Sequence, residues 1–452
     1  MRSLNEKCAV VGLFGSTNAA KLAYLGLYAM QHRGQESTGI SVSDGEKIAT
    51  IKDRGLVSHV FNDSVLARLP GQSAIGHNRY STAGEDSILD AQPVFARYDL
   101  GEMAIAHNGN FPNAQVVRQR LIDEGAIFQS SMDTENLIHL IARSQKGRLQ
   151  DRILDALMQV DGAYSLLFLS RTKLFAARDP HGFRPLSIAK LPDGGYMIAS
   201  ESCAFDLVGA EFIREIEPGE MVILQRGSEP VSIPFAQPQP KHCIFEHVYF
   251  ARPDSFLFGQ SVYGVRKELG RLLHLENPIE ADMVIPVPDS SIPHAIGYSQ
   301  ESGLPFELGI IRNHYVGRTF IEPMQEVRDL KVKKKLSPIK ELIRGKRLVI
   351  VDDSIVRGTT SRKIIQMLRD AGAKEVHMRI ASPPVAFPCY YGIDTPHQEE
   401  LIRHRMNVEE MERYLGADSL SFLSIEALHQ ASGSTDRFCL ACFDGNYFHT
   451  PA

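Results

Sequence analysis

The apolar segments of the chain follow two different patterns, and the change between them is the feature that most constrains the fold. From Cys8 to about Pro230, short and often alternating apolar runs are separated by polar turns and a few helical stretches. From about Glu280 onward, an apolar run is followed by a turn, a helix and another apolar run. Alternation with period two is typical of half-buried strands, whereas the second order is typical of parallel strands joined by helices. The sequence therefore predicts two architectures in series.

The expected elements can be placed by residue number. In the first half the pattern predicts strands over 8–14, 73–77, 103–106 and 164–169, and helices over 20–31, 116–124 and 134–144. We expect them to form a mixed, largely antiparallel sheet with helices. In the second half it predicts a strand over 347–353, a helix over 359–371 and a strand over 375–381. Because the polar segment 225–240 contains four prolines, we place the boundary between domains 8–235 and 236–452 there.

Composition excludes several classes of function. The 452 residues include 49 Lys plus Arg and 54 Asp plus Glu, for a net charge of −5, so a broad basic face for nucleic acid is not expected. No apolar stretch approaches the ~20 residues that span a bilayer, and residues 1–7 lack the apolar core of a secretory signal. We therefore expect a cytoplasmic protein without a membrane or nucleic-acid partner. Six cysteines in a reducing compartment are better candidates for ligands or nucleophiles than for disulfides.

Polar, glycine-containing stretches lie at the edges of apolar runs in the first half. Cys8 begins the first of these runs, and the polar stretches cover 32–37, 76–82, 107–110 and 132–135. Taken alone, Cys8 fits a buried strand cysteine, and the histidines of these stretches fit turn or packing positions. Loops on a rigid scaffold nevertheless gather functional groups, so the four stretches together favour a site.

Together with Cys8, these stretches resemble the class II glutamine amidotransferase domain, which has an α+β, αββα N-terminal-nucleophile fold. The resemblance implies that Cys8 is the nucleophile for the glutamine amide. It also implies that Arg79 and Asp133 bind the α-carboxylate and α-amino groups of glutamine, and that Asn108 and Gly109 form the oxyanion hole. The residue types suit these roles, because Arg matches a carboxylate, Asp balances an ammonium, and two N–H donors stabilise an oxyanion.

The nucleophile of such a domain needs a base. A free α-amino group has a pKa of about 7.7–8.0, so the amine of Cys8 itself would serve at neutral pH. Removal of Met1 alone does not expose that amine. We therefore expect residues 1–7 to be a propeptide that is cut from Cys8, by the precursor itself.

A second polar edge follows the apolar run 347–351. Asp352 and Asp353 end this run, and Gly358, Thr359 and Thr360 open the next helix. A helix start offers unpaired N–H groups to a phosphate, and adjacent carboxylates suit ribose hydroxyls or hydrated Mg²⁺. An acidic strand end capped by threonines is the plainer alternative, and a nucleotide P-loop is excluded because no GxxxxGK[ST] motif occurs.

This edge resembles the signature of type I phosphoribosyltransferases, which have an α/β fold and bind phosphoribosyl pyrophosphate (PRPP). The resemblance implies that Asp352, Asp353, Gly358, Thr359 and Thr360 bind PRPP. A similar segment at 284–291 implies that Ser290 joins Asp352 and Asp353 at Mg²⁺.

Both domains in one chain resemble the amidophosphoribosyltransferases, over residues 8–446. The resemblance implies that glutamine supplies ammonia to C1 of PRPP, giving 5-phosphoribosylamine, pyrophosphate and glutamate in the first step of de novo purine synthesis. It also implies purine-nucleotide inhibitors and a homo-oligomer. Because free ammonia would be protonated in water, a sealed path has a purpose, and we expect residues 313–340 to order over bound PRPP and close it. A hexosamine synthase of the same amidotransferase class does not account for 352–360, and a non-catalytic PRPP sensor does not require Cys8, Arg79 and Asp133 together.

The remaining cysteines form a second candidate site. Cys439 and Cys442 form a CxxC motif, and Cys243 and Cys389 would complete a set of four thiolates. The setting resembles the bacterial amidophosphoribosyltransferases that carry a [4Fe–4S] cluster, which these cysteines are then expected to bind in a structural role. A Cys₄ zinc site and plain buried thiols are the alternatives. Cys203 is expected to be a packed core residue.

Overall fold

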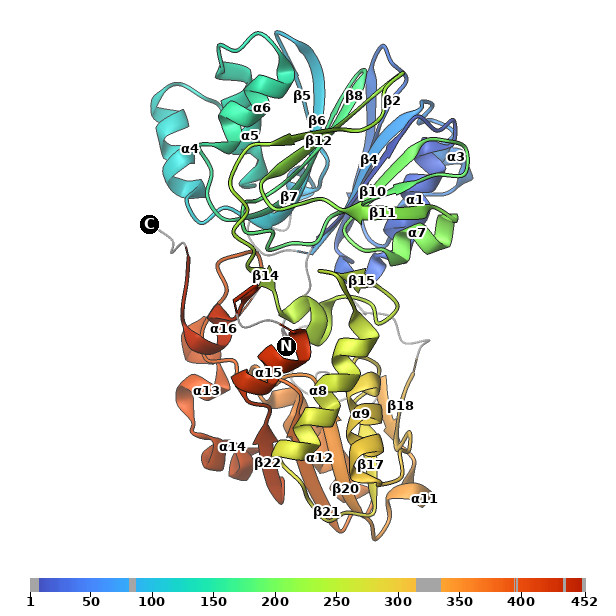
Figure 1. Cartoon of the computed structure of the whole chain (residues 1–452), viewed down its shortest axis with the longest axis vertical. Coiled ribbons are helices and arrows are strands. Elements are labelled where there is room, and N and C mark those ends of the chain that lie inside the picture. The colour runs from blue at the N-terminus through green and yellow to red at the C-terminus, as the bar shows by residue number, and fades with distance from the viewer. Residues whose placement is uncertain are drawn as a thin grey trace.

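The computed structural model describes residues 8–80, 87–313, 335–393, 395, 397–433 and 436–448. Two bodies follow one another along the long axis of the molecule, with the first half of the chain in one and the second half in the other (Figure 1). The expected propeptide 1–7 and residues 314–334 of the expected closing segment lie outside the described residues. No helix in the described ranges is long and apolar enough to cross a membrane.

The first body contains a seven-stranded sheet in the order β11-β9-β10-β1-β4-β2-β3. Its strands are β1 (Ala9–Phe14), β2 (Ser37–Ser43), β3 (Ile48–Arg54), β4 (Ser73–Arg79), β9 (Ser187–Lys190), β10 (Tyr196–Ala199) and β11 (Glu211–Glu215). Every neighbouring pair is antiparallel. Because Ala9 pairs with Asn78, the start of β1 and the end of β4 meet at one edge, which brings Cys8 beside Arg79.

A six-stranded sheet packs against the first one, in the order β13-β12-β8-β7-β6-β5. Its strands are β5 (Val94–Tyr98), β6 (Gly101–Asn110), β7 (Ala163–Ser170), β8 (Lys173–Arg178), β12 (Glu220–Gln225) and β13 (Val231–Pro234). Its neighbouring strands are also antiparallel. The expectation of one mixed sheet was therefore wrong, because alternation shows that a strand is half-buried and does not show which strands pair.

Helices cover the outer faces of the two sheets. The helices are α1 (Ala19–Ala29) and α7 (Cys203–Val208) on the seven-stranded sheet, and α4 (Ala114–Asp123), α5 (Thr134–Arg143) and α6 (Leu149–Leu157) on the six-stranded sheet. Between the sheets, buried residues such as Val10, Ile75 and Leu167 form one core. The layer order is helix, sheet, sheet, helix, which is the αββα arrangement expected from the resemblance. Cys203 is buried in the α1 core, as predicted.

The second body contains a parallel sheet in the order β17-β20-β21-β22. Its strands are β17 (Met283–Pro286), β20 (Arg347–Asp352), β21 (Glu375–Ile380) and β22 (Ser419–Phe422), and its main helices are α8 (Val262–Glu276), α9 (Ile292–Ser302), α12 (Thr359–Asp370), α14 (Val408–Leu415) and α15 (Ile425–Ser432). Val349 packs in the cluster of α8 and α9, and Ile350 packs in that of α12. Since successive strand residues face opposite ways, helices cover both faces. The predicted strand, helix, strand unit is confirmed.

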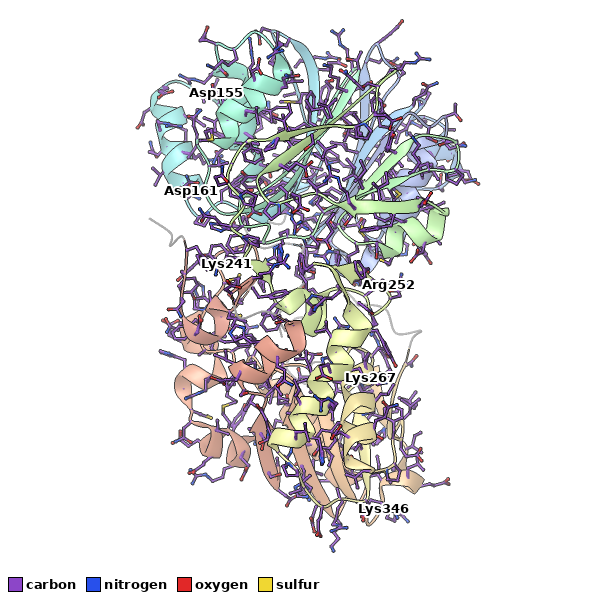
Figure 2. The ribbon with its side chains drawn as sticks, in the orientation of Figure 1. Asp155, Asp161, Lys241, Arg252, Lys267 and Lys346 are labelled. Atoms are coloured by element: carbon purple, nitrogen blue, oxygen red, sulfur yellow. The ribbon has the colours of Figure 1, made fainter. Side chains whose placement is uncertain are left out.

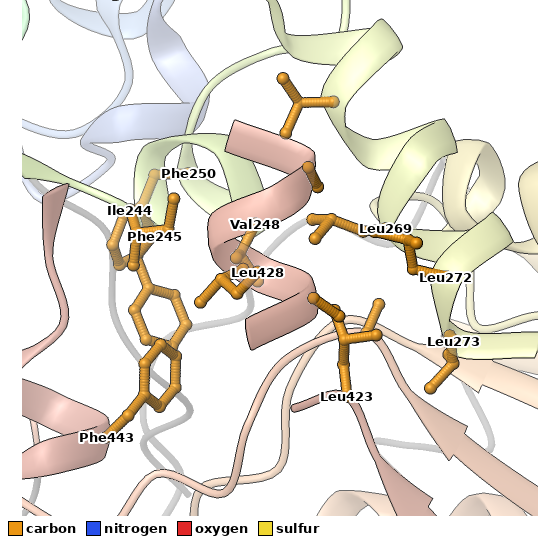
Figure 3. Packing of buried hydrophobic residues seen from close by; sticks show 14 of the residues in the cluster. Ile244, Phe245, Val248, Phe250, Leu269, Leu272, Leu273, Leu423, Leu428 and Phe443 are labelled. Carbon is orange, nitrogen blue, oxygen red and sulfur yellow. The ribbon is translucent and has the colours of Figure 1, made fainter. Parts of the chain in front are cut away.

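The junction between the bodies is built from the middle and the end of the chain. Strand β14 (His242–Cys243) pairs in parallel with β23 (Phe438–Cys439), and the π-helix η3 (Glu246–Phe250) follows. Phe245 and Phe443 lie against each other in Figure 3, with ring centroids 5.3 Å apart. Shorter elements complete the fold: η1 (Gln31–Arg33), α2 (Val57–Val60), α3 (Asp63–Leu66), η2 (Ile88–Asp90), β15 (Phe256–Leu257), β16 (Gln260–Ser261), β18 (Ile310–Arg312), β19 (Leu336–Pro338), α11 (Lys340–Ile343), η4 (Gln398–Glu400), α13 (Ile402–Arg405) and α16 (Ala441–Asp444).

Candidate active site

Most of the site residues predicted in the first half line one cavity. It is bounded by Cys8, Arg79, Tyr80, Gln92, His107, Gly109, Asn110, Met132 and Asp133. Cys8 lies just before β1, Arg79 ends β4, and Gly109 lies at the end of β6. The two sheets therefore deliver a thiol, a cation and a backbone donor to a common edge, while the start of α5 delivers the carboxylate of Asp133.

The two charged residues of this cavity have built-in partners. Arg79 is buried, and its Nη2 lies 3.6 Å from Asp90 Oδ2. Asp133 Oδ2 accepts the N–H of Phe111 at 3.1 Å, and its Oδ1 lies 3.5 Å from His107 Nδ1. Burial alone would raise the pKa of Asp133, but His107 and the Phe111 N–H outweigh burial and lower it. The cavity thus holds a fixed cation and a fixed anion.

Asn108 and Gly109 lie near the carboxyl end of strand β6. Gly109 has φ +154°, and a Cβ there would come 1.9 Å from the carbonyl oxygen of Ala163, so only glycine fits. Asn108 is fully buried and does not line the cavity, yet neither Oδ1 nor Nδ2 has a hydrogen-bond partner among the described residues. An unpartnered buried amide is costly. The Asn108 amide therefore keeps a donor and an acceptor that no described residue satisfies.

The carboxylates predicted in the second half lie at the carboxyl end of β20. Asp353 Oδ2 accepts the hydroxyl of Ser290 at 2.6 Å, and Asp352 Oδ1 accepts that of Ser291 at 3.1 Å. Burial raises the pKa of both aspartates, and the neighbouring charge of Asp353 raises that of Asp352 further. Ligands of parallel sheets bind outside the carboxyl ends of the strands. The structure therefore joins Ser290 to the two aspartates, as the sequence predicted, and adds Ser291.

The turn after β20 leads into the start of α12. Gly358 is the N-cap residue of α12 with φ +74°, and a Cβ there would meet Ile402 at 2.5 Å. Thr359 is half-buried and Thr360 is exposed, so the first turn of the helix is open on one side. Its backbone N–H groups and hydroxyls suit a phosphate.

A second cavity gathers the four cysteines predicted to act together. It is lined by Phe183, Arg184, Cys243, Cys389, Tyr391, Ile393, Cys439, Ala441, Cys442 and Tyr447. The pairing of β14 with β23 places Cys243 opposite Cys439. Burial raises the pKa of Cys439 and Cys442 above the usual range. Within the described ranges, no group of three or more His, Cys, Asp or Glu side chains has the arrangement of a single-ion site.

Sequence reasoning missed a buried charge network at the junction. Arg33 donates to Glu246 through Nη1 and Nη2 at 2.9 and 2.8 Å and also to Glu201, and Arg184 donates to Glu246 at 3.0 Å. All four side chains are almost fully buried. Arg252, labelled between the two bodies in Figure 2, donates its backbone N–H to Glu201. Glu246 lies inside an apolar run, which was the only available signal.

The network reaches the candidate nucleophile. Arg33 Nε donates to the carbonyl oxygen of Cys8 at 3.4 Å. Burial alone would raise the pKa of Glu246, but Arg33 and Arg184 outweigh it and lower the pKa. The junction is therefore held by compensated charges that contact the edge of the first cavity.

Comparison with known proteins assigns each half to a family. The model of the glutamine amidotransferase domain matches residues 77–206, and that of the phosphoribosyl transferase domain matches residues 267–382. The first range contains Arg79, Gly109 and Asp133, and the second contains Ser290 and Asp352.

Full-length relatives extend both matches to almost the entire chain. The amidophosphoribosyltransferase of Rhizobium etli is 53% identical over 96% of this chain and 89% of its own. Amidophosphoribosyltransferase 1, chloroplastic, of Arabidopsis thaliana is 51% identical over 98% of this chain and 78% of its own. The solved glutamine PRPP amidotransferase from B. subtilis, complexed with ADP and GMP, superposes with a TM-score of 0.93 at 48% identity and covers 98% of each chain. The sequence, the fold and the presence of both domains in one chain thus agree that the chain belongs to the amidophosphoribosyltransferase family.

Proposed function

We propose how the described residues carry out the reaction of this family, the glutamine-dependent transfer of an amino group to PRPP in purine biosynthesis. The observation that carries the proposal is the gathering of Cys8, Arg79, Gly109 and Asp133 around one cavity. The same chain holds Asp352 and its neighbours at the carboxyl edge of a parallel sheet. One site releases ammonia and the other accepts it.

In the first cavity, Arg79 binds the α-carboxylate of glutamine and Asp133 binds its α-ammonium. The lowered pKa of Asp133 keeps it ionised at neutral pH, so it complements that ammonium. Cys8 Sγ attacks the side-chain amide carbon, and the C–N bond breaks to release ammonia and leave a thioester. Water then hydrolyses the thioester to glutamate. The Gly109 N–H and the Asn108 amide stabilise the oxyanion in both steps.

The proton of the Cys8 thiol passes to the α-amino group of the same residue and from there to the departing nitrogen, which leaves as ammonia; this relay requires cleavage before Cys8. Residues 1–7 therefore act as a propeptide. Mass spectrometry of active enzyme is expected to find chains that begin at Cys8. Active enzyme that retains residues 1–7 in full would contradict the cleavage.

At the second edge, Asp352 and Asp353 hold the ribose, and the start of α12 with Gly358, Thr359 and Thr360 holds the 5′-phosphate. Hydroxyl and carboxylate oxygens are the ligands Mg²⁺ prefers, so Ser290, Asp352 and Asp353 fit this ion. A bound Mg²⁺ would neutralise charge on the pyrophosphate. Ammonia forms the C1–N bond as the C1–O bond to pyrophosphate breaks, and the product loses one proton.

The cysteine cavity is proposed as a [4Fe–4S] site of the bacterial iron–sulfur type. Support comes from four cysteines around one cavity. Thiolate ligands also suit iron–sulfur clusters. Its role is structural, because Cys243 lies in β14 at the junction, Cys439 lies in the partner strand β23, and Cys389 and Cys442 come from two further segments of the second half. Anaerobically purified protein is expected to contain about four iron atoms per chain and to absorb broadly in the visible. One zinc and no iron would favour the Cys₄ alternative.

Further parts of the proposal concern context. We place the domain boundary near residue 235. We also place the enzyme in the cytoplasm, where its six cysteines do not form disulfides, and the chain in a homo-oligomer. Purine nucleotides are proposed as inhibitors, because the B. subtilis structure is complexed with ADP and GMP. Nucleotide titrations of the initial rate and light scattering test the inhibitors and the oligomer.

One pair of assays tests the division of roles. Cys8→Ala is expected to abolish the glutamine-dependent reaction and to keep the ammonia-dependent consumption of PRPP. The double variant Asp352→Asn with Asp353→Asn is expected to lose both. Loss of the ammonia reaction in folded Cys8→Ala would contradict the proposal.

A further inference from the structure

A segment of the second half of the chain contacts Gly109 and Asn110, two residues that line the glutamine cavity. We propose that residues 389–392 are a positioning element that fixes Gly109 in the geometry required of an oxyanion donor. The inference rests on the proposed function, because it takes Gly109 as that donor. It adds residues of the phosphoribosyltransferase body to the machinery for glutamine.

Two contacts carry the inference. Gly392 has φ +90°, and a Cβ there would come 2.8 Å from the carbonyl carbon and 2.9 Å from the carbonyl oxygen of Gly109. Beside it, Asn110 Nδ2 donates to the carbonyl oxygen of Tyr390 at 2.9 Å. The backbones of the two segments therefore touch with no side chain between them, which only glycine permits.

Gly109 is confined from a second direction by β7. The carbonyl oxygen of Ala163 occupies the space where a Cβ of Gly109 would lie. With Ala163 and Gly392 both in contact, the peptide of Gly109 has little room to rotate. A donor that is already aimed at the developing charge requires no reorganisation during the reaction.

The segment itself is firmly held. Arg184 Nη2 donates to the carbonyl oxygen of Tyr391 at 2.9 Å, and the rings of Tyr391 and Phe183 stack with centroids 4.3 Å apart. The Tyr391 hydroxyl accepts the N–H of Phe448 at 2.7 Å. These contacts come from the first body, from the junction and from the end of the chain, so the segment has the rigidity that positioning requires.

The segment also connects two sites of the molecule. It begins at Cys389, which lines the cysteine cavity, and ends at Gly392 against the glutamine cavity. The Tyr391 N–H donates to Cys389 Sγ at 3.3 Å. Residues 389–392 therefore link the cysteine cavity to Gly109 along one short stretch of backbone.

The test compares two glycines that share a backbone conformation and differ in their surroundings. Gly392→Ala introduces backbone strain and a contact with Gly109. Gly416→Ala introduces the strain alone, since φ is +77° and a Cβ there meets nothing within 4 Å. For each processed holoenzyme, kcat and KM are measured with glutamine and with ammonia. The rate at which 6-diazo-5-oxo-L-norleucine alkylates Cys8 is measured as well.

Gly392→Ala is expected to lower the kcat with glutamine by about 10–100-fold, because a misplaced donor stabilises the transition state less. The KM for glutamine is expected to stay within about threefold, since the donor acts after binding. Alkylation of Cys8 slows, the ammonia reaction is unchanged, and Gly416→Ala resembles wild type in every assay.

An equal loss in the glutamine and ammonia assays, or a Gly392→Ala enzyme that matches Gly416→Ala, overturns the inference. Should Gly392→Ala fail to fold, Phe183→Leu loosens the segment from the stacked face of Tyr391. That variant is expected to lower the glutamine kcat about 3–10-fold with the ammonia rate preserved. The inference is overturned if the glutamine kcat does not fall, or if both rates fall equally. If Cys8→Ala instead kept the full glutamine-dependent rate, the proposed function itself would be rejected.

Discussion

The glutamine cavity and the carboxyl edge of β20 differ in how their charges are compensated. In the cavity, Arg79 lies near Asp90, and the partners of Asp133 lower its pKa. At the edge, Asp352 and Asp353 are neighbours held by serine hydroxyls, and burial raises the pKa of both. The first site is organised before its ligand arrives. The second favours an incoming cation, because two buried carboxylates are costly to ionise together.

The difference follows from the substrates. Glutamine brings one positive and one negative group, which a fixed anion and a fixed cation match. PRPP brings several negative charges, which a divalent cation beside the two carboxylates would offset. The junction network holds these two unlike sites in one molecule, so its loss should affect both of them.

Glu246→Ala is therefore expected to have the largest effect. It leaves the buried guanidinium groups of Arg33 and Arg184 without the carboxylate that joins them, and the free energy of unfolding should fall by about 3–5 kcal/mol. Chemical denaturation measures the loss. The control is Asp254→Ala, which breaks the exposed pair with Arg252 and should cost less than about 1 kcal/mol. Equal effects of the two variants would show that the network does not hold the bodies together.

Gly109→Ala tests the glutamine cavity alone. The new Cβ collides with the carbonyl oxygen of Ala163 and displaces the donor. The kcat with glutamine should fall by about 10²–10³-fold, the effect of losing one oxyanion donor. Initial rates with glutamine and with ammonia measure it. The ammonia rate should not change, and a parallel fall in both rates would contradict the separation of the two sites.

Arg79→Lys tests how the glutamine cavity binds its substrate. Lysine keeps the charge but loses the planar fork that matches a carboxylate. The KM for glutamine should rise by roughly 10–100-fold, since a hydrogen bond to a charged group contributes about 1.5–3 kcal/mol. The KM for PRPP, from the same steady-state data, should remain that of wild type. A glutamine KM within twofold of wild type would remove Arg79 from the binding site.

The smallest effect is a difference in pH dependence, measured by thermal unfolding without Mg²⁺. The raised pKa of Asp352 gives stability that is complete below the unfolded pKa of about 3.9 and is lost as pH rises through the folded value. Asp352→Asn avoids that loss. At pH 8 its Tm should exceed that of wild type by about 2–4 °C for each kcal/mol of unfolding free energy that wild type loses. This difference in Tm should be smaller at pH 5.

Asp133→Asn is the matched opposite case. The lowered pKa of Asp133 gives stability that is present above its ordinary value and is lost only as pH falls through the lowered one. Its difference from wild type should therefore stay constant between pH 5 and pH 8. A gap for Asp352→Asn that is the same at both pH values would mean that the two sites are charged alike.

Local features of the fold were predictable from the sequence. The helix expected over 359–371 is observed as α12 over Thr359–Asp370, because an apolar stripe and Gly372 define it. The strand expected over 73–77 is observed as β4 over Ser73–Arg79. Pairing was not predictable in the same way, so the expected single sheet is two antiparallel sheets.

Long-range contacts explain what the sequence did not reveal about the sites. Arg33 and Glu246 are 213 positions apart, and Gly109 and Gly392 touch across the junction. Each looks ordinary in its own segment, where Arg33 is one of several polar residues and Gly392 is one of 35 glycines. The polar stretches of the two predicted sites stood out because they lie at the ends of apolar runs, and the roles of their residues came from the family resemblance.

In the proposed reaction the two sites work in sequence on one nitrogen atom. The most direct test follows glutamate and pyrophosphate together in one reaction with glutamine, PRPP and Mg²⁺. We expect the two products to appear at equal rates, and Cys8→Ala supplied with ammonia to make pyrophosphate without glutamate. Glutamate that accumulates at the full rate while no pyrophosphate forms would contradict it.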